Sequence, residues 1–121
     1  MVEYEVAVAG LGAMGSATAY ELALRGSRII GFDRFTPPHT LGSTHGRTRI
    51  IREAYFEDPL YVPLVQRAYE KWQDLETRTQ QRLFIQTGGL MIGPEDGELF
   101  AGALASAREH SLPHEVLSAS I

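Results

Sequence analysis

The 121-residue chain contains no cysteine, which excludes a disulfide framework, a thiolate metal site and a cysteine nucleophile within it. It also lacks a basic excess, because 11 Lys and Arg face 15 Asp and Glu; a net charge of −4 argues against nucleic-acid binding. No apolar run approaches the ~20 residues of a membrane-spanning helix. Glu3 and Glu5 stand where a secretory signal would be basic, so we expect a cytoplasmic protein without a membrane partner.

The first third of the chain has the pattern of an α/β fold. A total of 44 % hydrophobic and 21 % charged residues is typical of a globular protein, and the length suits one domain. Residues 4–9 predict a strand buried on both faces, and a glycine-rich turn follows. A helix over 16–25 and a second strand over 27–33 come next. This order is typical of a βαβ unit with two parallel strands, which indicates a Rossmann-type sheet.

The segment after the second strand is predicted to be irregular. Pro37–Pro38 blocks regular structure, so we expect a loop over residues 36–46. Residues 49–55 are either extended or helical, and we favour the extended interpretation because Gly46 weakens a helix. The helical alternative would place three side chains on one face at i, i+4 and i+7, namely His45, Arg49 and Arg52.

Later patterns add helices and a hairpin to this unit. We predict a long helix over residues 59–80 and a two-stranded hairpin formed by residues 83–87 and 90–92. A second helix over 96–110 follows, and a strand starts at Val116. Gly88–Gly89 suits the hairpin turn. These elements make a poor finished sheet, so we expect residues 1–121 to be the N-terminal part of a longer protein.

The glycine-rich turn matches a dinucleotide-binding pattern, G-x-G-x-x-G, spelled Gly10-Leu11-Gly12-Ala13-Met14-Gly15. The pattern alone is weak, but here it follows a strand and opens a helix. Gly10 permits the tight turn, Gly12 lets a pyrophosphate approach the backbone, and Gly15 lets helix and strand pack closely. The helix N-terminus, with Ala13 and Met14, offers N–H groups to phosphate. The alternative is a glycine turn without a ligand.

An acid and a basic loop follow the second strand. Asp33 lies 18 residues after Gly15, near the ~20 expected of the acid that binds ribose hydroxyls, and it disfavours NADP, although Arg34 beside it leaves that point open. Residues 34–52 hold four arginines and no acid, which suggests either a bound anion or a solvated basic loop. A nicotinamide-binding domain normally continues from the second strand into another helix. The loop found here can instead wrap back over an extended cofactor and reach a flavin ring, so it favours a flavin cofactor.

With these motifs the chain resembles the monomeric sarcosine oxidase and N-methyltryptophan oxidase family, FAD-dependent amine oxidases of the D-amino acid oxidase superfamily. The resemblance rests on the glycine turn, on Asp33, on Pro37-Pro38-His39-Thr40 and on the run from Gly42 to Arg52. It implies that FAD lies extended, with its pyrophosphate over residues 10–15. It further implies that Asp33 holds the adenosine ribose and that Arg34 lies beside the adenine end. Ser43 and Thr44 would meet the pyrophosphate and the ribityl region.

The resemblance also implies an activity. His45, Thr48 and Arg49 would stand close to the flavin ring, and Arg52 would bind the substrate carboxylate. The reaction would oxidise a secondary or N-methyl amino acid with oxygen, giving an imine or aldehyde and hydrogen peroxide, and no metal is required. The cysteine that carries FAD in the family belongs to the absent C-terminal half. Plainer roles are a structural His45, an Arg49 that neutralises phosphate, and an Arg52 paired with Glu53 or Glu57. A non-catalytic dinucleotide-binding fragment and an NAD-dependent dehydrogenase module are the alternative functions.

Overall fold

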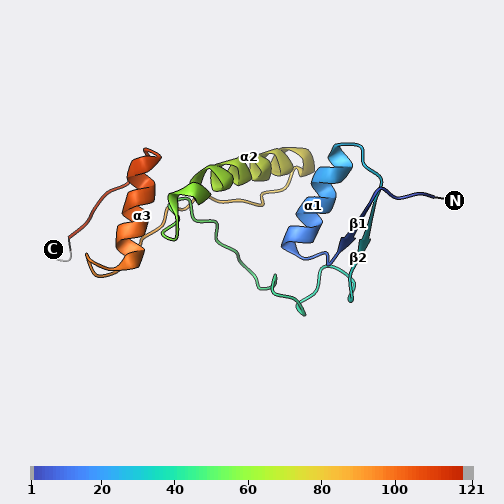
Figure 1. Ribbon diagram of the computed structural model, residues 1–121, viewed down its shortest axis with the longest axis horizontal. Coiled ribbons are helices and arrows are strands. Elements are labelled where there is room, and N and C mark those ends of the chain that lie inside the picture. Colours follow the sequence, from blue (N-terminus) through green and yellow to red (C-terminus); the bar gives the residue numbers. More distant parts are fainter. Residues whose placement is uncertain (1, 119–121) are drawn as a thin grey trace. The chain divides into compact units, whose positions relative to one another are not determined.

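The computed structural model describes residues 2–118, and the chain forms two compact units, Met1–Arg49 and Ile50–Ile121. Unit 1 contains the strand β1 (Val6–Ala9), the helix α1 (Ala13–Leu24) and the strand β2 (Ile29–Phe32), and unit 2 contains the helices α2 (Val62–Thr79) and α3 (Glu98–Glu109) (Figure 1). The 3-10 turn η1 (Pro59–Tyr61) precedes α2. None of the helices in the described part of the chain has the length and apolarity to cross a membrane.

Unit 1 is the predicted βαβ unit. β1 (Val6–Ala9) pairs in parallel with β2 (Ile29–Phe32), and the register places Val6 opposite Ile29. α1 (Ala13–Leu24) begins three residues before the predicted start, because the glycine turn itself enters the helix and Ser16 N–H donates to Gly12 O at 2.9 Å. The parallel sheet is therefore confirmed, and the helix start was placed too late.

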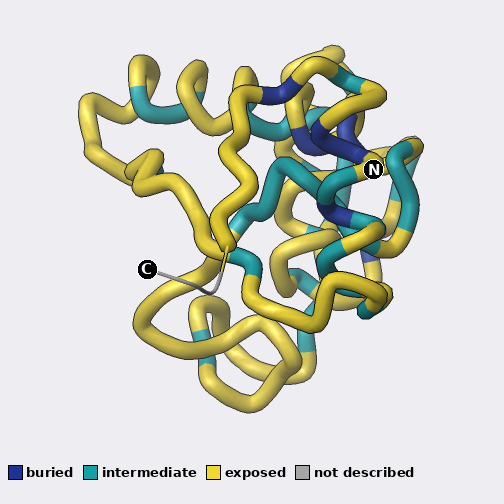
Figure 2. The backbone as a smooth tube through the Cα atoms, turned by 90° about the vertical axis from the view of Figure 1, so that its left-hand side faces the viewer, coloured by how far each residue is buried: buried dark blue, intermediate teal, exposed yellow. Residues whose placement is uncertain are grey.

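β1 is buried on one face only, so the prediction of two buried faces is wrong. Val8 is buried, whereas Ala7 and Ala9 are exposed. Along the described chain the buried stretches are short, and most of the backbone is exposed or intermediate (Figure 2). A parallel sheet needs helices on both faces to bury both sets of side chains. Unit 1 contains the single helix α1 among its described residues.

Unit 2 is built on two helices. Asp58 accepts a hydrogen bond from Leu60 N–H at 2.8 Å and so caps η1 (Pro59–Tyr61), which leads directly into α2 (Val62–Thr79). α3 (Glu98–Glu109) follows an irregular segment. The core of unit 2 is a cluster of buried residues with Ala54 packed against it: Val62, Ala107 and Leu112. Both predicted helices are confirmed.

The predicted hairpin at residues 83–92 is wrong, because this segment forms no strand. Leu83 N–H and Phe84 N–H donate instead to Glu76 Oε1, at 2.6 and 2.8 Å, which holds the segment to α2. Leu90 and Ile92 stay 69 % and 78 % exposed, so no element covers the apolar face that these two side chains would form in a strand. An isolated two-stranded hairpin is at best marginally stable in water.

Two other predicted segments are also irregular. Residues 49–55 contain no helix, so the helical alternative is wrong, and they pair with no strand. Residues 116–118 form no strand either, and the remainder of that predicted strand lies outside the described residues. Val116 and Leu117 are more than half exposed, so neither gains the burial that would favour a strand.

Candidate dinucleotide site at the glycine turn

The turn between β1 and α1 has two positions at which a side chain is excluded. Gly10 has φ +87°, in the left-handed region that favours glycine, and its N–H donates to Phe32 O at 2.7 Å. A Cβ on Gly15 would lie 1.7 Å from Gly10 O, so the first turn of α1 packs directly on the backbone of the turn. These two glycines give the turn its shape.

Gly12 differs from these two glycines because the protein itself leaves room for a side chain there. It is the N-cap of α1 with φ −70°, and a Cβ would meet Thr44 Oγ1 at 3.6 Å, an ordinary contact. Neither backbone conformation nor internal packing therefore requires glycine at this position. Gly12 has no side chain that could cap the helix, and the first turn of α1 carries no acidic residue. A surface at the positive end of the helix thus stays open to an anion.

Asp33, just after β2, is bound to the glycine turn. Its Oδ2 accepts a hydrogen bond from Leu11 N–H at 2.6 Å, and its Oδ1 lies 3.1 Å from both Phe35 N and His39 Nε2. The backbone donors, Leu11 first and Phe35 second, together with the His39 side chain, lower the pKa of Asp33 to about 2. Asp33 is therefore a carboxylate at neutral pH and holds the turn and the following loop together.

The loop after Asp33 returns to the start of α1. Thr44 Oγ1 accepts a hydrogen bond from Ala13 N–H at 3.3 Å. A pocket of about 320 Å³ opens beside this contact and is lined by Pro38, His39, Thr40, Thr44, His45 and Gly46. Two of the predicted site residues, Thr44 and His45, are thus brought to one pocket of the loop that also contacts the helix N-terminus.

Other predicted residues of unit 1 lie around this loop. The Arg34 guanidinium stands over the Phe35 ring at 5.3 Å, and Ser43 is exposed. Arg49 Nη1 donates to Thr48 O at 2.9 Å, so the Arg49 side chain folds back on its own backbone. This leaves both guanidinium groups at the surface of unit 1.

Arg52 belongs to unit 2. Its Nη2 lies 3.2 Å from Glu57 Oε1, and its guanidinium stands 5.0 and 5.3 Å from the ring centres of Tyr55 and Phe56. Its side chain is 38 % exposed. The guanidinium therefore already binds a carboxylate, against an aromatic surface.

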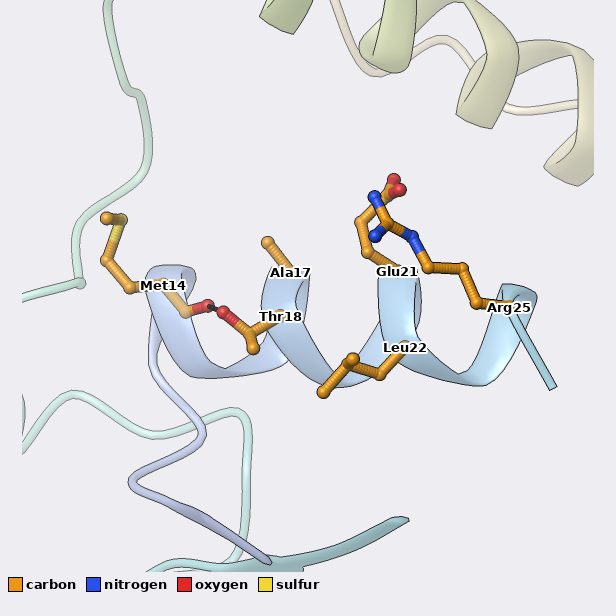
Figure 3. Close-up of a pocket in the computed structure, with 6 residues that line it drawn as sticks. All are labelled: Met14, Ala17, Thr18, Glu21, Leu22 and Arg25. Carbon is orange, nitrogen blue, oxygen red and sulfur yellow. Dashed lines mark hydrogen bonds between the residues drawn. The ribbon is translucent and has the colours of Figure 1, made fainter. Parts of the chain in front are cut away.

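A second hollow lies along α1 and shares only Met14 with the glycine turn. It measures about 380 Å³ and is lined by α1 and its C-cap: Met14, Ala17, Thr18, Glu21, Leu22 and Arg25 (Figure 3). The Met14 side chain lies on this side and is 85 % exposed. One helix alone supplies the lining, whereas a cofactor site needs converging polar groups, so we place the candidate site at the turn. No cluster of metal-ligating side chains is present among residues 2–118.

His39 is a residue of this site for which the sequence predicts no role. It stands in the Pro37-Pro38-His39-Thr40 segment on which the resemblance rests. Its distance of six residues from Asp33 in an irregular loop gives no periodicity from which a contact could be predicted. The only signal in the sequence is a proline-fixed loop just after Asp33.

Comparison with known proteins assigns the family. The model of the FAD dependent oxidoreductase family matches residues 5–121, and the chain belongs to this family, whose cofactor is FAD. The monomeric sarcosine oxidase of Streptomyces avermitilis is 48 % identical over 116 residues, which are 96 % of this chain and 30 % of that protein. The monomeric sarcosine oxidase of Bacillus sp. (strain NS-129) is 47 % identical over 114 residues, 93 % of this chain and 30 % of the relative.

A relative with a different name has the same coverage. The N-methyl-L-tryptophan oxidase of Yersinia pestis (strain Pestoides F) is 38 % identical over 119 residues, which are 98 % of this chain and 32 % of the relative. The chain thus spans about 30 % of the length of the curated relatives it matches. The predicted family and the predicted FAD cofactor are both confirmed.

Proposed function

We propose that the chain is the FAD-binding part of a longer amine oxidase that oxidises a secondary or N-methyl amino acid. Oxygen would be the acceptor, and the products would be an imine or aldehyde and hydrogen peroxide. The observation that carries this proposal is Gly12, a glycine that the protein does not itself require, at the N-cap position of α1 in a family whose cofactor is FAD. The names of the relatives, sarcosine oxidase and N-methyl-L-tryptophan oxidase, supply the class of substrate.

The residues of the turn fit the ADP half of FAD. Backbone N–H groups at Gly12, Met14 and Gly15 would face the pyrophosphate, and the helix dipole adds to the attraction. Asp33 accepts three hydrogen bonds within the protein, and a carboxylate has about four acceptor positions. One position therefore remains for a ribose hydroxyl. Arg34 would lie beside the adenine end, and Ser43 and Thr44 would meet the pyrophosphate and the ribityl chain.

The remaining residues would act on the substrate side. When bound, FAD supplies the oxidising power that removes the hydrogen next to the amine nitrogen. His45 and Thr48 would border the flavin ring, and the Arg49 guanidinium would place positive charge beside it. Arg52 would orient the substrate through its carboxylate, because a guanidinium binds a carboxylate with two parallel hydrogen bonds. In the structure this guanidinium already binds a carboxylate, that of Glu57, which is the same kind of contact that the proposal assigns to the substrate.

The function is tested on the complete protein that contains this chain. Purified protein should show the absorption spectrum of a flavin and should release hydrogen peroxide with sarcosine or N-methyl-L-tryptophan. Dimethylamine is the matched control, because it has the secondary amine without the carboxylate, and it should be a poor substrate. A protein that lacks flavin, or that reduces NAD with these amines, would overturn the proposal in favour of the two alternative functions.

The role of Arg52 has its own test. Arg52→Ala should raise KM for the amino acid at least about tenfold, the scale of losing hydrogen bonds to a charged group, while the flavin stays bound. Arg67→Ala is the matched control, because Arg67 is another arginine of unit 2 that pairs with a glutamate, Glu70, on the surface of α2. An unchanged KM in Arg52→Ala would assign Arg52 to the Glu57 ion pair alone.

A further inference from the structure

The hydrogen bonds of His39 define which ring nitrogen carries the proton. Leu41 N–H donates to His39 Nδ1 at 3.1 Å, so Nδ1 acts as an acceptor and carries no proton. The proton of the neutral ring is therefore on Nε2, which donates to Asp33 Oδ1 at 3.1 Å. Both ring nitrogens are thus used at once, one toward the loop and one toward the acid.

Packing fixes the same ring in place. Phe35 meets the His39 ring edge-on, with ring centres 5.2 Å apart, and the His39 side chain is only 20 % exposed. A Cβ on Gly42 would come within 3.5 Å of His39 Cε1, so the loop passes close to the ring on another side. Side chains held by both packing and hydrogen bonds keep their neighbours in one arrangement.

The ring connects two parts of the candidate site. Asp33, on one side, is bound to the glycine turn through Leu11 N–H. The loop on the other side continues from Leu41 to Thr44, which contacts Ala13 N–H at the start of α1. The loop is consequently attached to the turn at two places, and His39 makes one of these attachments.

We propose that His39 is a positioning residue that acts through Asp33. By donating to Oδ1, the His39 ring fixes the rotation of the carboxylate, so that its remaining acceptor position points to the ribose of a bound ADP moiety. The inference rests on the proposed binding of FAD at this turn. His39 itself makes no contact with the cofactor in this proposal.

The experiment measures ADP and FAD binding to the flavin-free complete protein by isothermal titration calorimetry. ADP is the probe because it contains the adenosine and the pyrophosphate without the flavin. His39→Gln places an amide N–H near the position of Nε2 and keeps the bond to Asp33. His39→Asn places its amide near the position of Nδ1, keeps the bond to Leu41 and loses Asp33. The comparison of these two variants stays decisive even where His39→Ala folds poorly, and His114→Ala, in unit 2, is the histidine control.

We expect His39→Asn and His39→Ala to bind ADP about tenfold more weakly, while His39→Gln stays within about threefold of the parent. In an Asp33→Asn background, His39→Ala should weaken binding no further, because two residues that act through one contact are not additive. Equal ADP affinities of His39→Gln and His39→Asn would overturn the positioning role of His39. The same would follow if His39→Ala weakened ADP binding as strongly in the Asp33→Asn background as in the parent. If the parent protein binds neither ADP nor FAD, the proposed function is overturned together with the role of His39.

Discussion

Each of the two units of the chain is stabilised internally by a different kind of interaction. Among the described residues, unit 1 buries one hydrophobic side chain, Val8, whereas the other five buried hydrophobic residues lie in unit 2. Unit 1 is organised instead by side chains that bind the backbone, above all Asp33 and Thr44. The candidate site therefore depends on hydrogen bonds around a glycine turn, while unit 2 depends on the packing of apolar side chains.

The units share one device, a helix that touches a backbone carbonyl through a glycine. Gly15 of α1 lies on Gly10, and Gly102 of α3 lies on Phe56, where an added Cβ would stand 2.0 Å from the carbonyl oxygen. In unit 1 this contact shapes the glycine turn of the candidate site, and in unit 2 it joins a helix to the segment before η1. Mutating each glycine separates these two uses.

The largest effect is expected for Gly15→Ala. The added methyl would force the glycine turn away from α1, because 1.7 Å to Gly10 O is far inside van der Waals contact. FAD binding in the complete protein should fall by more than about 100-fold, the scale of losing two hydrogen bonds to a charged group. Equilibrium dialysis with FAD checks this result.

The control for Gly15→Ala is Gly93→Ala, where an added Cβ meets no atom within 4 Å. It should leave FAD affinity unchanged. Normal FAD affinity in Gly15→Ala would show that the turn adapts without cost, which would remove the turn from the proposed site.

A smaller effect, and one on a different property, is expected for Gly102→Ala. Alanine alone would favour the helix by about 1 kcal/mol, but the clash with Phe56 O should cost more, leaving a net loss of roughly 2 kcal/mol in the free energy of unfolding. Urea denaturation measures the loss, with Gly89→Ala, another open position, as the control. FAD affinity at low urea should stay unchanged. A stabilised Gly102→Ala protein would contradict the close packing of α3.

The smallest effect is the pH dependence that Asp33 gives to unit 1. Its pKa in the folded chain is about 2, below the ordinary 3.8, so its stabilising contribution is complete above pH 3.8 and is lost as pH falls toward 2. The stability difference between the parent and Asp33→Asn should therefore be constant from pH 7 to about pH 5 and shrink below that. Urea midpoints measured from pH 7 to pH 3 give this difference.

Glu76→Gln is the counterpart of Asp33→Asn in unit 2. The backbone N–H groups of Phe84 and Leu83 lower the pKa of Glu76, so its contribution is also lost on acidification, starting below its ordinary pKa of 4.5. A difference that stays constant down to pH 3 in both variants would contradict the hydrogen bonds assigned to these carboxylates.

Elements that depend on residues close together in the sequence could be predicted, whereas elements that depend on distant residues could not. The βαβ order, α2 and α3 follow from local periodicity and from glycine, which act over a few residues. The hairpin at 83–92 was predicted wrongly because its pattern was local, while the deciding interaction was the Glu76 carboxylate one helix turn before the end of α2. The prediction of a second buried face for β1 was wrong for the same reason, because a strand face is buried only where another element covers it.

The candidate site divides in the same way. Gly10, Gly12, Gly15 and Asp33 could be found from the sequence, because their spacing in a βαβ unit reflects fixed geometry of turn and helix. The contact of Thr44 with Ala13 and the bonds of His39 could not be found, because an irregular loop has no period. The Arg52–Glu57 pair was one of the alternatives that the sequence left open, and the structure forms it.

The sequence by itself determined the family, the FAD cofactor and the order of strand, glycine turn, helix and strand, because each depends on residues close together along the chain. Only the tertiary structure decided that Asp33 binds Leu11 N–H, that His39 binds Asp33, and that Gly12 is the one glycine of the turn without an internal steric reason. The physical reason is that hydrogen bonds and steric contacts depend on distances in space, which an irregular loop sets only when it folds back on the turn.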